Sequence, residues 1–280
     1  MKVVLAGAFG NLGVEILKAL TAAGHEVVAA DMVVDSAKEI ACERRVMDAT
    51  RPETLKGLCD GADAVISTVG LTRTSATITN YQVDYQGNLN LLEEAKRAGV
   101  QRFVYISVIK ADSDPTVPML HAKALFEEKL KASGLTWVIH RPTGYFYDIA
   151  KVFMPMIEKG QVTLLGKQDV HANVIDTPDF ADFIVRHLED ENCTYDVGGR
   201  ETYSYEEMAK MFFAAAGKPA VIKRAPVFLF DVLALVNHWK KNGKEAIIRF
   251  SKWTLTHDLV GKDTWGEHSF RAYIESCYKK

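Results

Sequence analysis

The chain has 280 residues, of which 48% are hydrophobic and 25% are charged, and its formal net charge is −2. These values are typical of a globular protein with one full core and a modest second lobe. A net charge so close to zero gives no reason to expect nucleic acid or an anionic membrane as a partner.

The cysteines and the N-terminal residues indicate the cellular compartment in which the protein is expected. The four cysteines lack CxxC spacing, which argues against a zinc site or a disulfide framework and favours a reducing compartment. The first apolar run ends at Gly7 and is too short for a signal peptide, and no run reaches the length of a membrane span. We therefore expect a cytoplasmic protein with no metal and no membrane partner.

The first thirteen residues predict a phosphate-binding unit. Val3–Ala6 is a short, continuously apolar run, as in a strand buried on both faces of a parallel sheet. Gly7, Gly10 and Gly13 follow, and residues 14–20 have the apolar spacing of a helix. A tight turn alone would explain glycines. Their place between a strand and a helix favours a bound dinucleotide, with its pyrophosphate at the helix N-terminus.

Asp31 ends a second apolar run, residues 25–30. A carboxylate at this point accepts hydrogen bonds from the ribose hydroxyls of an adenosine and repels a 2′-phosphate, which predicts NAD(H) in preference to NADP(H). In the alternative interpretation Asp31 is a solvated turn residue, and Lys38 or Arg44 folds over a phosphate.

Asp48 ends a short strand within residues 44–50. Its carboxylate is a candidate for the adenine amino group and equally for the N-cap of a helix over residues 52–59, where Thr50 is as good a cap. The two interpretations are compatible.

Strands and helices alternate through the rest of the first half. The fourth strand ends in Thr68, Val69 and Gly70, which should face the middle of the cofactor, and a loop rich in Thr and Ser follows over residues 71–79. Further strands are expected at 100–107 and 135–140, and helices at 81–98 and 120–131. This alternation predicts an α/β fold with a Rossmann-type, doubly wound parallel sheet and ligands at the carboxyl ends of its strands.

The pattern changes after Tyr147, where helices dominate. Ser204 and Glu207 form a capping-box pattern before a helix that reaches residue 216, and residues 226–240 predict a strongly apolar helix. We expect a dinucleotide-binding core over residues 1–147, with return segments later in the chain. Residues 148–280 should mainly form a smaller, helix-rich C-terminal lobe over the carboxyl edge of the sheet, with a substrate between the two.

With these features in place, the chain resembles the atypical short-chain dehydrogenases/reductases, in their NmrA-like, NAD(P)-binding branch. The resemblance extends over about residues 1–216 and is carried by Asp48 and by GAFGNLG at 7–13, GNLNLLEEA at 87–95, GVQRFVYIS at 99–107, RPTG at 141–144 and YDVGG at 195–199. Together with the motifs above, it implies a cofactor site formed by Gly7, Ala8, Phe9, Gly10, Asn11, Leu12, Gly13, Asp31, Asp48, Ala49, Thr68, Val69, Gly70, Ser107, Lys123 and Pro142.

The resemblance also implies a catalytic group of Asn, Ser, Tyr and Lys, in which Tyr is the general acid/base and Lys holds the nicotinamide ribose. Lys123 matches the lysine. The tyrosine position is Met119, the serine position falls on Val108 beside Ser107, and the asparagine position falls on Asp84. Methionine has no proton to donate and valine does not polarise a carbonyl. Residues near the expected site that could substitute are His121, Tyr85, Tyr145 and Tyr147.

Two functions remain open. The first is an NAD(H)-dependent oxidoreductase for a small, largely apolar carbonyl or enone compound, with Lys123 orienting the nicotinamide ribose and Met119, Tyr145 and Phe146 beside the substrate. The second is a non-catalytic, dinucleotide-binding regulatory or assembly protein, for which an exposed apolar face on helix 226–239 would be a sign. A sugar-nucleotide epimerase fits less well, because it needs the Tyr–Lys pair and a basic patch for a diphosphate.

Overall fold

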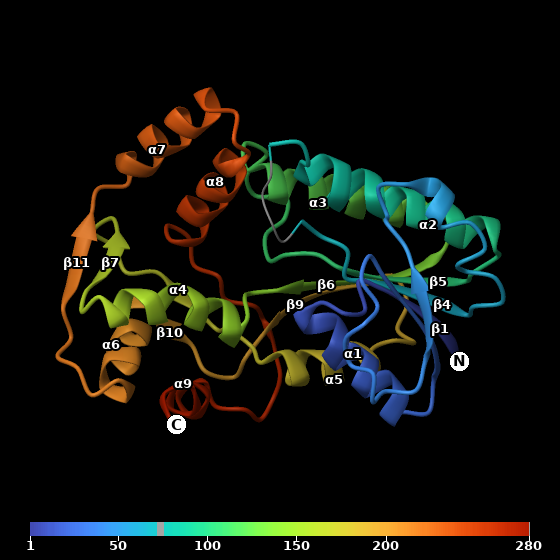
Figure 1. Ribbon diagram of the computed structural model, residues 1–280, viewed down its shortest axis with the longest axis horizontal. Helices are drawn as coiled ribbons and strands as arrows, with labels where there is room; N and C mark the ends of the chain where they lie inside the picture. The colour runs from blue at the N-terminus through green and yellow to red at the C-terminus, as the bar shows by residue number, and fades with distance from the viewer. Residues whose placement is uncertain (72–75, 280) are drawn as a thin grey trace. The chain divides into compact units, whose positions relative to one another are not determined.

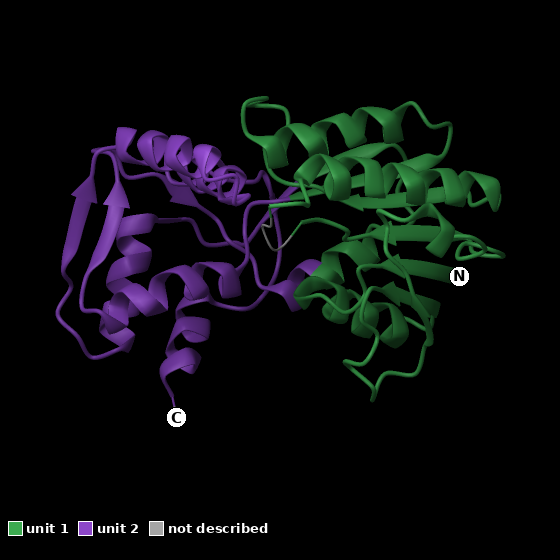
Figure 2. Ribbon diagram, turned by 45° about the horizontal axis from the view of Figure 1, so that its top comes forward, with its two compact units in different colours: residues 1–141, 181–195 green, residues 142–180, 196–280 purple. Residues whose placement is uncertain are grey.

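The computed structural model describes residues 1–71 and 76–279 (Figure 1). Its residues form two compact units (Figure 2). Unit 1 comprises Met1–Arg141 and Ala181–Tyr195, and unit 2 comprises Pro142–Phe180 and Asp196–Lys280. Residues 72–75 of the loop predicted at 71–79 lie outside the described residues.

A parallel sheet forms the centre of unit 1. Its strands are β1 (Lys2–Ala6), β2 (Glu26–Asp31), β3 (Glu43–Val46), β4 (Ala64–Ser67), β5 (Arg102–Ile106) and β6 (Thr136–Pro142). With β9 (Cys193–Gly198) and β12 (Asp263–Thr264), the order within the described residues is β12-β9-β6-β5-β4-β1-β2-β3. The chain winds outward from β1 to β2 on one side and to β4 on the other, with parallel pairing on both. This confirms the predicted doubly wound, Rossmann-type fold, and it places the switch point of the strand order beside β1.

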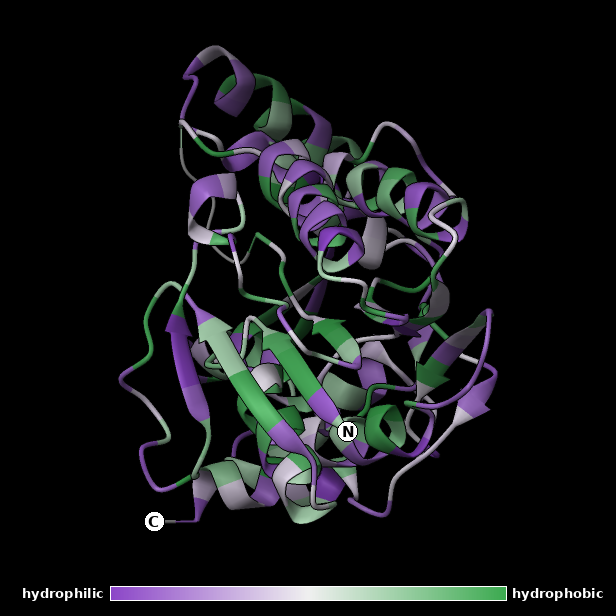
Figure 3. Cartoon of the chain, turned by 90° about the vertical axis from the view of Figure 1, so that its right-hand side faces the viewer, coloured by the Kyte–Doolittle hydropathy of each residue, from purple (hydrophilic) through white to green (hydrophobic). Residues whose placement is uncertain are grey.

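Helices cover both faces of this sheet. In Figure 1, α1 (Asn11–Ala22) lies on one face, and α2 (Asn88–Arg97) and α3 (Pro118–Lys131) lie on the other. Hydrophobic residues follow the central strands (Figure 3), and Val3–Ala6 of β1 is fully buried, as the apolar run predicts. Two irregular turns complete this part, the 3₁₀ turn Pro52–Thr54 and the π-helix Tyr81–Gly87 directly before α2.

Unit 2 is rich in helices, with two small sheets. Its helices are α4 (Phe146–Glu158), α6 (Tyr205–Ala215), α7 (Phe228–Trp239), α8 (Lys244–Thr254), α9 (Phe270–Tyr278) and the first turn of α5 (Thr177–Arg186), which continues into unit 1. The strands β7 (Val162–Leu165) and β11 (Ile222–Ala225) pair in parallel, and β8 (His171–Ala172) and β10 (Tyr203–Ser204) pair antiparallel. The capping box of Ser204 and Glu207 is present at the start of α6, as predicted.

The sequence predicts a helix around residues 36–42 and another over residues 152–158, and both predictions need correction. Residues 36–42 form no helix, because the guanidinium of Arg44 binds the backbone carbonyls of this segment and holds it in turns; its partners are Val34, Ser36, Ala37 and Ile40. Helix α4 begins at Phe146 instead of Val152. Within the described ranges, every helix is too short or too polar to cross a membrane.

A buried histidine on β6 makes the stability of unit 1 sensitive to acid. His140 is fully buried, stacks on Tyr195 at 5.6 Å between ring centroids and meets Phe183 edge-on. Burial is the main cause that lowers the pKa of His140 to about 3, with the nearby His187 contributing. Below pH 6.5 the His140 side chain of the unfolded chain therefore binds a proton, whereas in the folded chain it stays neutral until the pH approaches about 3.

The contribution of His140 to stability should be complete above pH 6.5 and should be lost at roughly 1.4 kcal/mol per pH unit as the pH falls toward 3. We expect His140→Phe to flatten the decline in the free energy of unfolding over this range, measured by urea denaturation at several pH values. His25→Phe, at a partly exposed position, is the control. An unchanged slope in His140→Phe would show that the site tolerates the charged ring.

Candidate functional site

The loop between β1 and α1 contains three glycines, which differ in whether the structure leaves space for a side chain. Gly7 has φ +81°, and an added Cβ would lie 2.3 Å from Thr68 Oγ1. A Cβ on Gly13 would lie 2.1 Å from the Gly7 carbonyl oxygen. Gly10 is exposed and extended (φ −72°, ψ 169°), and the nearest atom to its added Cβ is 3.6 Å away. The chain itself therefore requires glycine at 7 and 13 but not at 10, where the small residue instead leaves an open approach to the backbone.

The N-terminus of α1 suits an anion. Gly10 is its N-cap, no side chain caps the helix, and its first turn contains no acidic residue. The N–H groups of that turn and the helix dipole provide a partial positive charge at this end. A pyrophosphate fits these groups, and the open approach over Gly10 would let it reach them.

Asp31 and Thr68 hold the glycine loop from two strand ends. Asp31 Oδ2 accepts from the Phe9 N–H at 2.9 Å and Oδ1 accepts from the Met32 N–H at 2.7 Å. The Thr68 hydroxyl donates toward the Gly7 carbonyl at 3.0 Å. A carboxylate has about four acceptor positions, so Asp31 retains capacity for ribose hydroxyls.

The guanidinium of Arg44 lies over the Phe9 ring, 4.8 Å from its centroid, but both of its terminal nitrogens already bind loop carbonyls. The alternative in which Arg44 folds over a phosphate would therefore break these bonds. Lys38 is exposed in the same loop.

We expect Asp31→Ala to weaken NADH binding by about tenfold and to narrow the preference over NADPH, because the substitution removes an acceptor for the ribose and a repulsive charge. Parallel fluorescence titrations with the two dinucleotides measure both effects. Asp35→Ala, an exposed acid in the next loop, is the control. If both dissociation constants of Asp31→Ala equal those of the wild type, Asp31 does not belong to the site.

Asp48 and Ala49 follow β3 in a tight turn. Asp48 Oδ1 accepts from the backbone N–H and the hydroxyl of Thr50, at 2.9 and 2.7 Å, whereas the N-cap of the following 3₁₀ turn is Arg51. Asp48 thus closes its own turn and does not cap a helix as the sequence suggested. The Ala49 carbonyl accepts from the Asn90 amide at 2.9 Å, which ties this turn to α2.

Lys123 lies beside the end of β4, where its ammonium group meets three oxygens. Nζ is 3.3 Å from Asp84 Oδ1, 3.3 Å from the Ile106 carbonyl and 3.4 Å from the Tyr105 hydroxyl. A Cβ added to Gly70 would lie 3.0 Å from Asp84 Oδ1 and 3.5 Å from Lys123 Nζ. The structure thus brings together Gly70 and Lys123, two predicted cofactor residues, and adds a buried carboxylate from the π-helix.

Tyr105 does not replace the missing catalytic tyrosine. Burial, with the nearby charges of Asp84 and Glu127, raises the pKa of Tyr105 well above its usual value, and its ring is fully buried in the core of unit 1. Its hydroxyl therefore stays protonated and has no access to a substrate. The family's tyrosine position, Met119, lies one turn before Lys123 on α3.

Ser107 is also committed to a structural contact. Its hydroxyl donates to Glu127 Oε1 at 2.6 Å. Glu127 is only 2% exposed and accepts from Arg141 Nε at 2.9 Å as well. The one hydroxyl proton of Ser107 thus points to a carboxylate and not to a carbonyl to be polarised, and Val108 supplies no proton.

Of the substitutes considered for the acid, His121 has a defined partner. Its Nδ1 is 2.8 Å from the Tyr81 hydroxyl, and the two rings pack edge to face at 5.8 Å. Tyr85 packs against the core of unit 1. The Tyr81–His121 pair connects the π-helix to α3, as the Asp84–Lys123 pair does, and it is a feature that helical periodicity did not predict.

The remaining predicted residues belong to unit 2. Pro142 is buried at the end of β6, and the Tyr145 ring stacks on Tyr147 at 5.5 Å. Burial raises the pKa of Tyr145 well above its usual value. Phe146 is 3% exposed and packs against Phe270 of α9 at 4.9 Å, so its ring is part of the core of unit 2.

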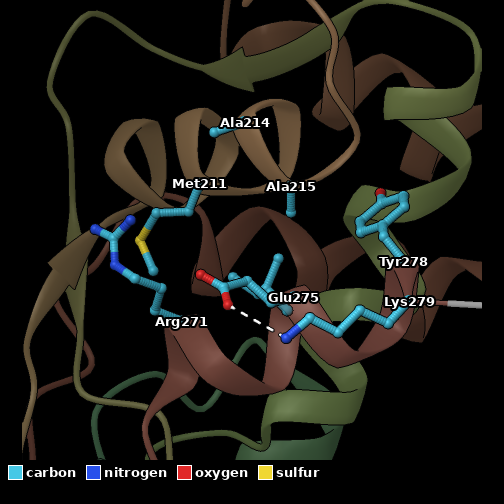
Figure 4. Close-up of a pocket in the computed structure, with 8 residues that line it drawn as sticks. Met211, Ala214, Ala215, Arg271, Glu275, Tyr278 and Lys279 are labelled. Atoms are coloured by element: carbon cyan, nitrogen blue, oxygen red, sulfur yellow. Dashed lines mark ion pairs between the residues drawn. The ribbon is translucent and has the colours of Figure 1, made fainter.

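Unit 2 also contains an open cavity of about 350 Å³ between α6 and α9 (Figure 4). Its lining includes Met211 and Ile274 together with the charged Arg271, Glu275 and Lys279, and Glu275 pairs with Lys279 at 3.9 Å. None of the predicted site residues lines it. Among residues 1–71 and 76–279, no group of three or more His, Cys, Asp or Glu side chains is placed to hold a metal ion.

The sequence-based prediction missed three features next to the predicted site residues. They are the structural residues Glu127 and Arg141 and the contact of Asp84 with Lys123. The position of Glu127 could have been predicted from the sequence, because Glu127 lies four residues after Lys123 and therefore on the same face of α3. The others depend on contacts between segments far apart in the chain.

A glycine loop between β1 and α1, an acidic residue at the end of β2 and a strand order that reverses beside that loop define a Rossmann-type NAD(P)-binding protein. The chain belongs to the NAD(P)H-binding family, which matches residues 7–191.

The relatives confirm the resemblance to atypical short-chain dehydrogenases/reductases. The photosystem II assembly factor Ycf39 of Guillardia theta is 29% identical over 257 residues, which cover 88% of this chain and 81% of that protein. A nucleoside-diphosphate-sugar epimerase from Staphylococcus aureus has a similar structure, with a TM-score of 0.78 and 17% identity over 98% of this chain and 100% of the other. An NADPH-dependent quinone oxidoreductase from Escherichia coli follows, with a TM-score of 0.75 and 16% identity over 99% and 100%. At these identities the two structures show the fold alone.

Proposed function

We propose that this protein binds NAD(H), in preference to NADP(H), as a structural or sensory ligand and acts in the assembly or regulation of a partner without turnover. The observation that carries this proposal is the state of the groups at the family's catalytic positions. Lys123 pairs with Asp84, the Ser107 hydroxyl donates to Glu127, and Met119 stands in the tyrosine position. No proton donor remains at the tyrosine and serine positions.

In this proposal the glycine loop and the N-terminus of α1 hold the pyrophosphate, Asp31 accepts from the adenosine ribose, and Lys123 donates to the nicotinamide ribose. When bound, a nicotinamide dinucleotide can accept or donate a hydride. Asp84 holds the ammonium of Lys123 beside Gly70 and balances its charge in a site with little solvent. The similarity to Ycf39, an assembly factor, supports the same interpretation.

The test is to separate binding from turnover in the purified full chain. We expect NADH to raise the melting temperature, by ligand linkage, while its absorbance stays constant for hours in the presence of a quinone or an aldehyde. Lys123→Ala should reduce the thermal shift, and Lys129→Ala, an exposed lysine on the same helix, should not. Consumption of NADH that Lys123→Ala abolishes would contradict the non-catalytic role.

The second candidate is an NAD(H)-dependent oxidoreductase for a small apolar carbonyl or enone, and the Tyr81–His121 pair favours it. This pair lies on the two elements that hold Asp84 and Lys123, and it contains a proton donor of the kind missing at Met119. In the same assay, oxidoreductase activity that falls in both Tyr81→Phe and His121→Gln would select this function. Activity that neither variant changes would remove the pair from the chemistry.

A further inference from the structure

Helix α7 presents an unusually apolar surface to solvent. One row, spaced as on a single helix face, consists of Phe228, Val232, Leu235 and Trp239, and Phe228 and Trp239 are 60% and 75% exposed. A second exposed row beside it consists of Leu229, Leu233 and Val236. Patches of this kind on a folded protein mark a surface that another body covers.

The opposite side of α7 is already covered by α8, which lies alongside it in Figure 1. Ala234 is buried, Asp231 pairs with Lys252 at 2.6 Å, and His238 Nδ1 lies 2.7 Å from Glu245. Asp231 and His238 thus bind groups on α8, although their side chains stay 56% and 64% exposed. The large apolar side chains of α7 are exposed as well and have no such partner on α8 to account for them.

Positive charge lies at the C-terminal end of the apolar surface. The hairpin of α7 and α8, residues 228–254, contains five Lys or Arg and two Asp or Glu, a net charge of +3, whereas the whole chain has −2. Lys240 and Lys241 directly follow Trp239 and Lys244 comes three residues later, and no carboxylate of a described residue pairs with them within 4 Å. The hairpin of α7 and α8 is therefore cationic, although the net charge of the whole chain is close to zero.

We propose that α7, with Lys240, Lys241 and Lys244, docks on the surface of an anionic lipid bilayer. Twelve residues of helix extend about 18 Å, too short to cross a bilayer core of about 30 Å but suited to lie in the plane of its interface. Trp239 and the three lysines would lie at the headgroups, where an indole and ammonium groups are stable. Two copies of a hairpin with a net charge of +3 repel each other, so a second copy of this chain fits the surface less well.

The proposal uses no residue of the candidate dinucleotide site and is tested without NADH. Full-length protein is floated with vesicles of phosphatidylcholine alone or of equimolar phosphatidylcholine and phosphatidylglycerol. We expect flotation with the anionic vesicles only, and weaker flotation at high salt. Brominated lipid should quench tryptophan fluorescence in the wild type, and this quenching should be lost in Trp239→Phe. The control is Trp253→Phe, which should keep the quenching because Trp253 is buried on α8 in the wild type.

Two sets of variants separate the apolar contribution from the charge. Val232→Ser with Leu235→Ser, and separately Lys240→Gln with Lys241→Gln and Lys244→Gln, should each weaken vesicle binding by about tenfold or more. Val46→Ser, at a similarly exposed valine in unit 1, is the control and should bind as the wild type does. Circular dichroism verifies that each variant is folded.

Three outcomes would overturn the proposal. The first is no flotation with anionic vesicles. The second is flotation that neither set of variants changes. The third is light scattering that shows a wild-type oligomer which the Val232→Ser, Leu235→Ser variant dissociates, because the surface would then be an interface with a protein.

Discussion

Gly10→Val should leave the fold intact and reduce NADH binding by about a hundredfold. An added Cβ would lie 3.6 Å from its nearest neighbour, the Gly7 carbonyl oxygen, and any residue can adopt the extended backbone of Gly10. It would, however, fill the approach to the N–H groups at the start of α1. Loss of two charge-assisted hydrogen bonds from the pyrophosphate, each about 1.5 kcal/mol, gives this magnitude.

The control for Gly10→Val is Gly13→Ala. Its Cβ would lie 2.1 Å from the Gly7 carbonyl oxygen, so this variant should lose stability together with binding. Urea denaturation and a fluorescence titration with NADH distinguish the two. Normal NADH affinity in Gly10→Val would show that no ligand approaches the backbone there.

The second large effect concerns stability. Glu127→Ala should lower the free energy of unfolding by about 3–5 kcal/mol, because Arg141 and Ser107 would lose the buried carboxylate that accepts from both. Arg141 Nη2 lies 2.5 Å from Glu127 Oε2, so the pair is bonded through two nitrogens of the guanidinium. Urea denaturation measures the change.

Glu128→Ala is the matched control, because Glu128 is the exposed neighbour of Glu127 on the same helix. It should change the free energy of unfolding by less than about 0.5 kcal/mol. Glu127→Gln keeps one acceptor oxygen, so its free energy of unfolding should lie between those of the two alanine variants. Equal stabilities for the two alanine variants would show that the Arg141–Glu127 contact contributes nothing net.

The parts of the fold predicted correctly depend on local signals. The strand at Val3–Ala6, the glycine loop and helix α1 follow one another in the chain, so periodicity and turn chemistry are sufficient. The same holds for α6, where Ser204 and Glu207 fix the helix start through two reciprocal hydrogen bonds. The sheet order then follows from the alternation of strands and helices.

The parts that the sequence did not predict depend on contacts of particular side chains, which periodicity does not reveal. Residues 36–42 contain no helix because Arg44, on the next strand, binds their carbonyls. Helix α8 was not predicted, and the structure shows that it packs against α7, the helix before it in the chain. At the site, Asp84 reaches Lys123 from a different helix, and no spacing along the chain indicates that pair.

A fluorescence titration of the purified protein with NADH and NADPH in parallel, repeated with Lys123→Ala, tests whether the protein binds NAD(H) at the proposed site. We expect saturable binding that prefers NADH and weakens in the variant, because we propose that Lys123 holds the nicotinamide ribose. Absence of binding by either dinucleotide would contradict the claim and would leave the Rossmann-type fold without its proposed ligand.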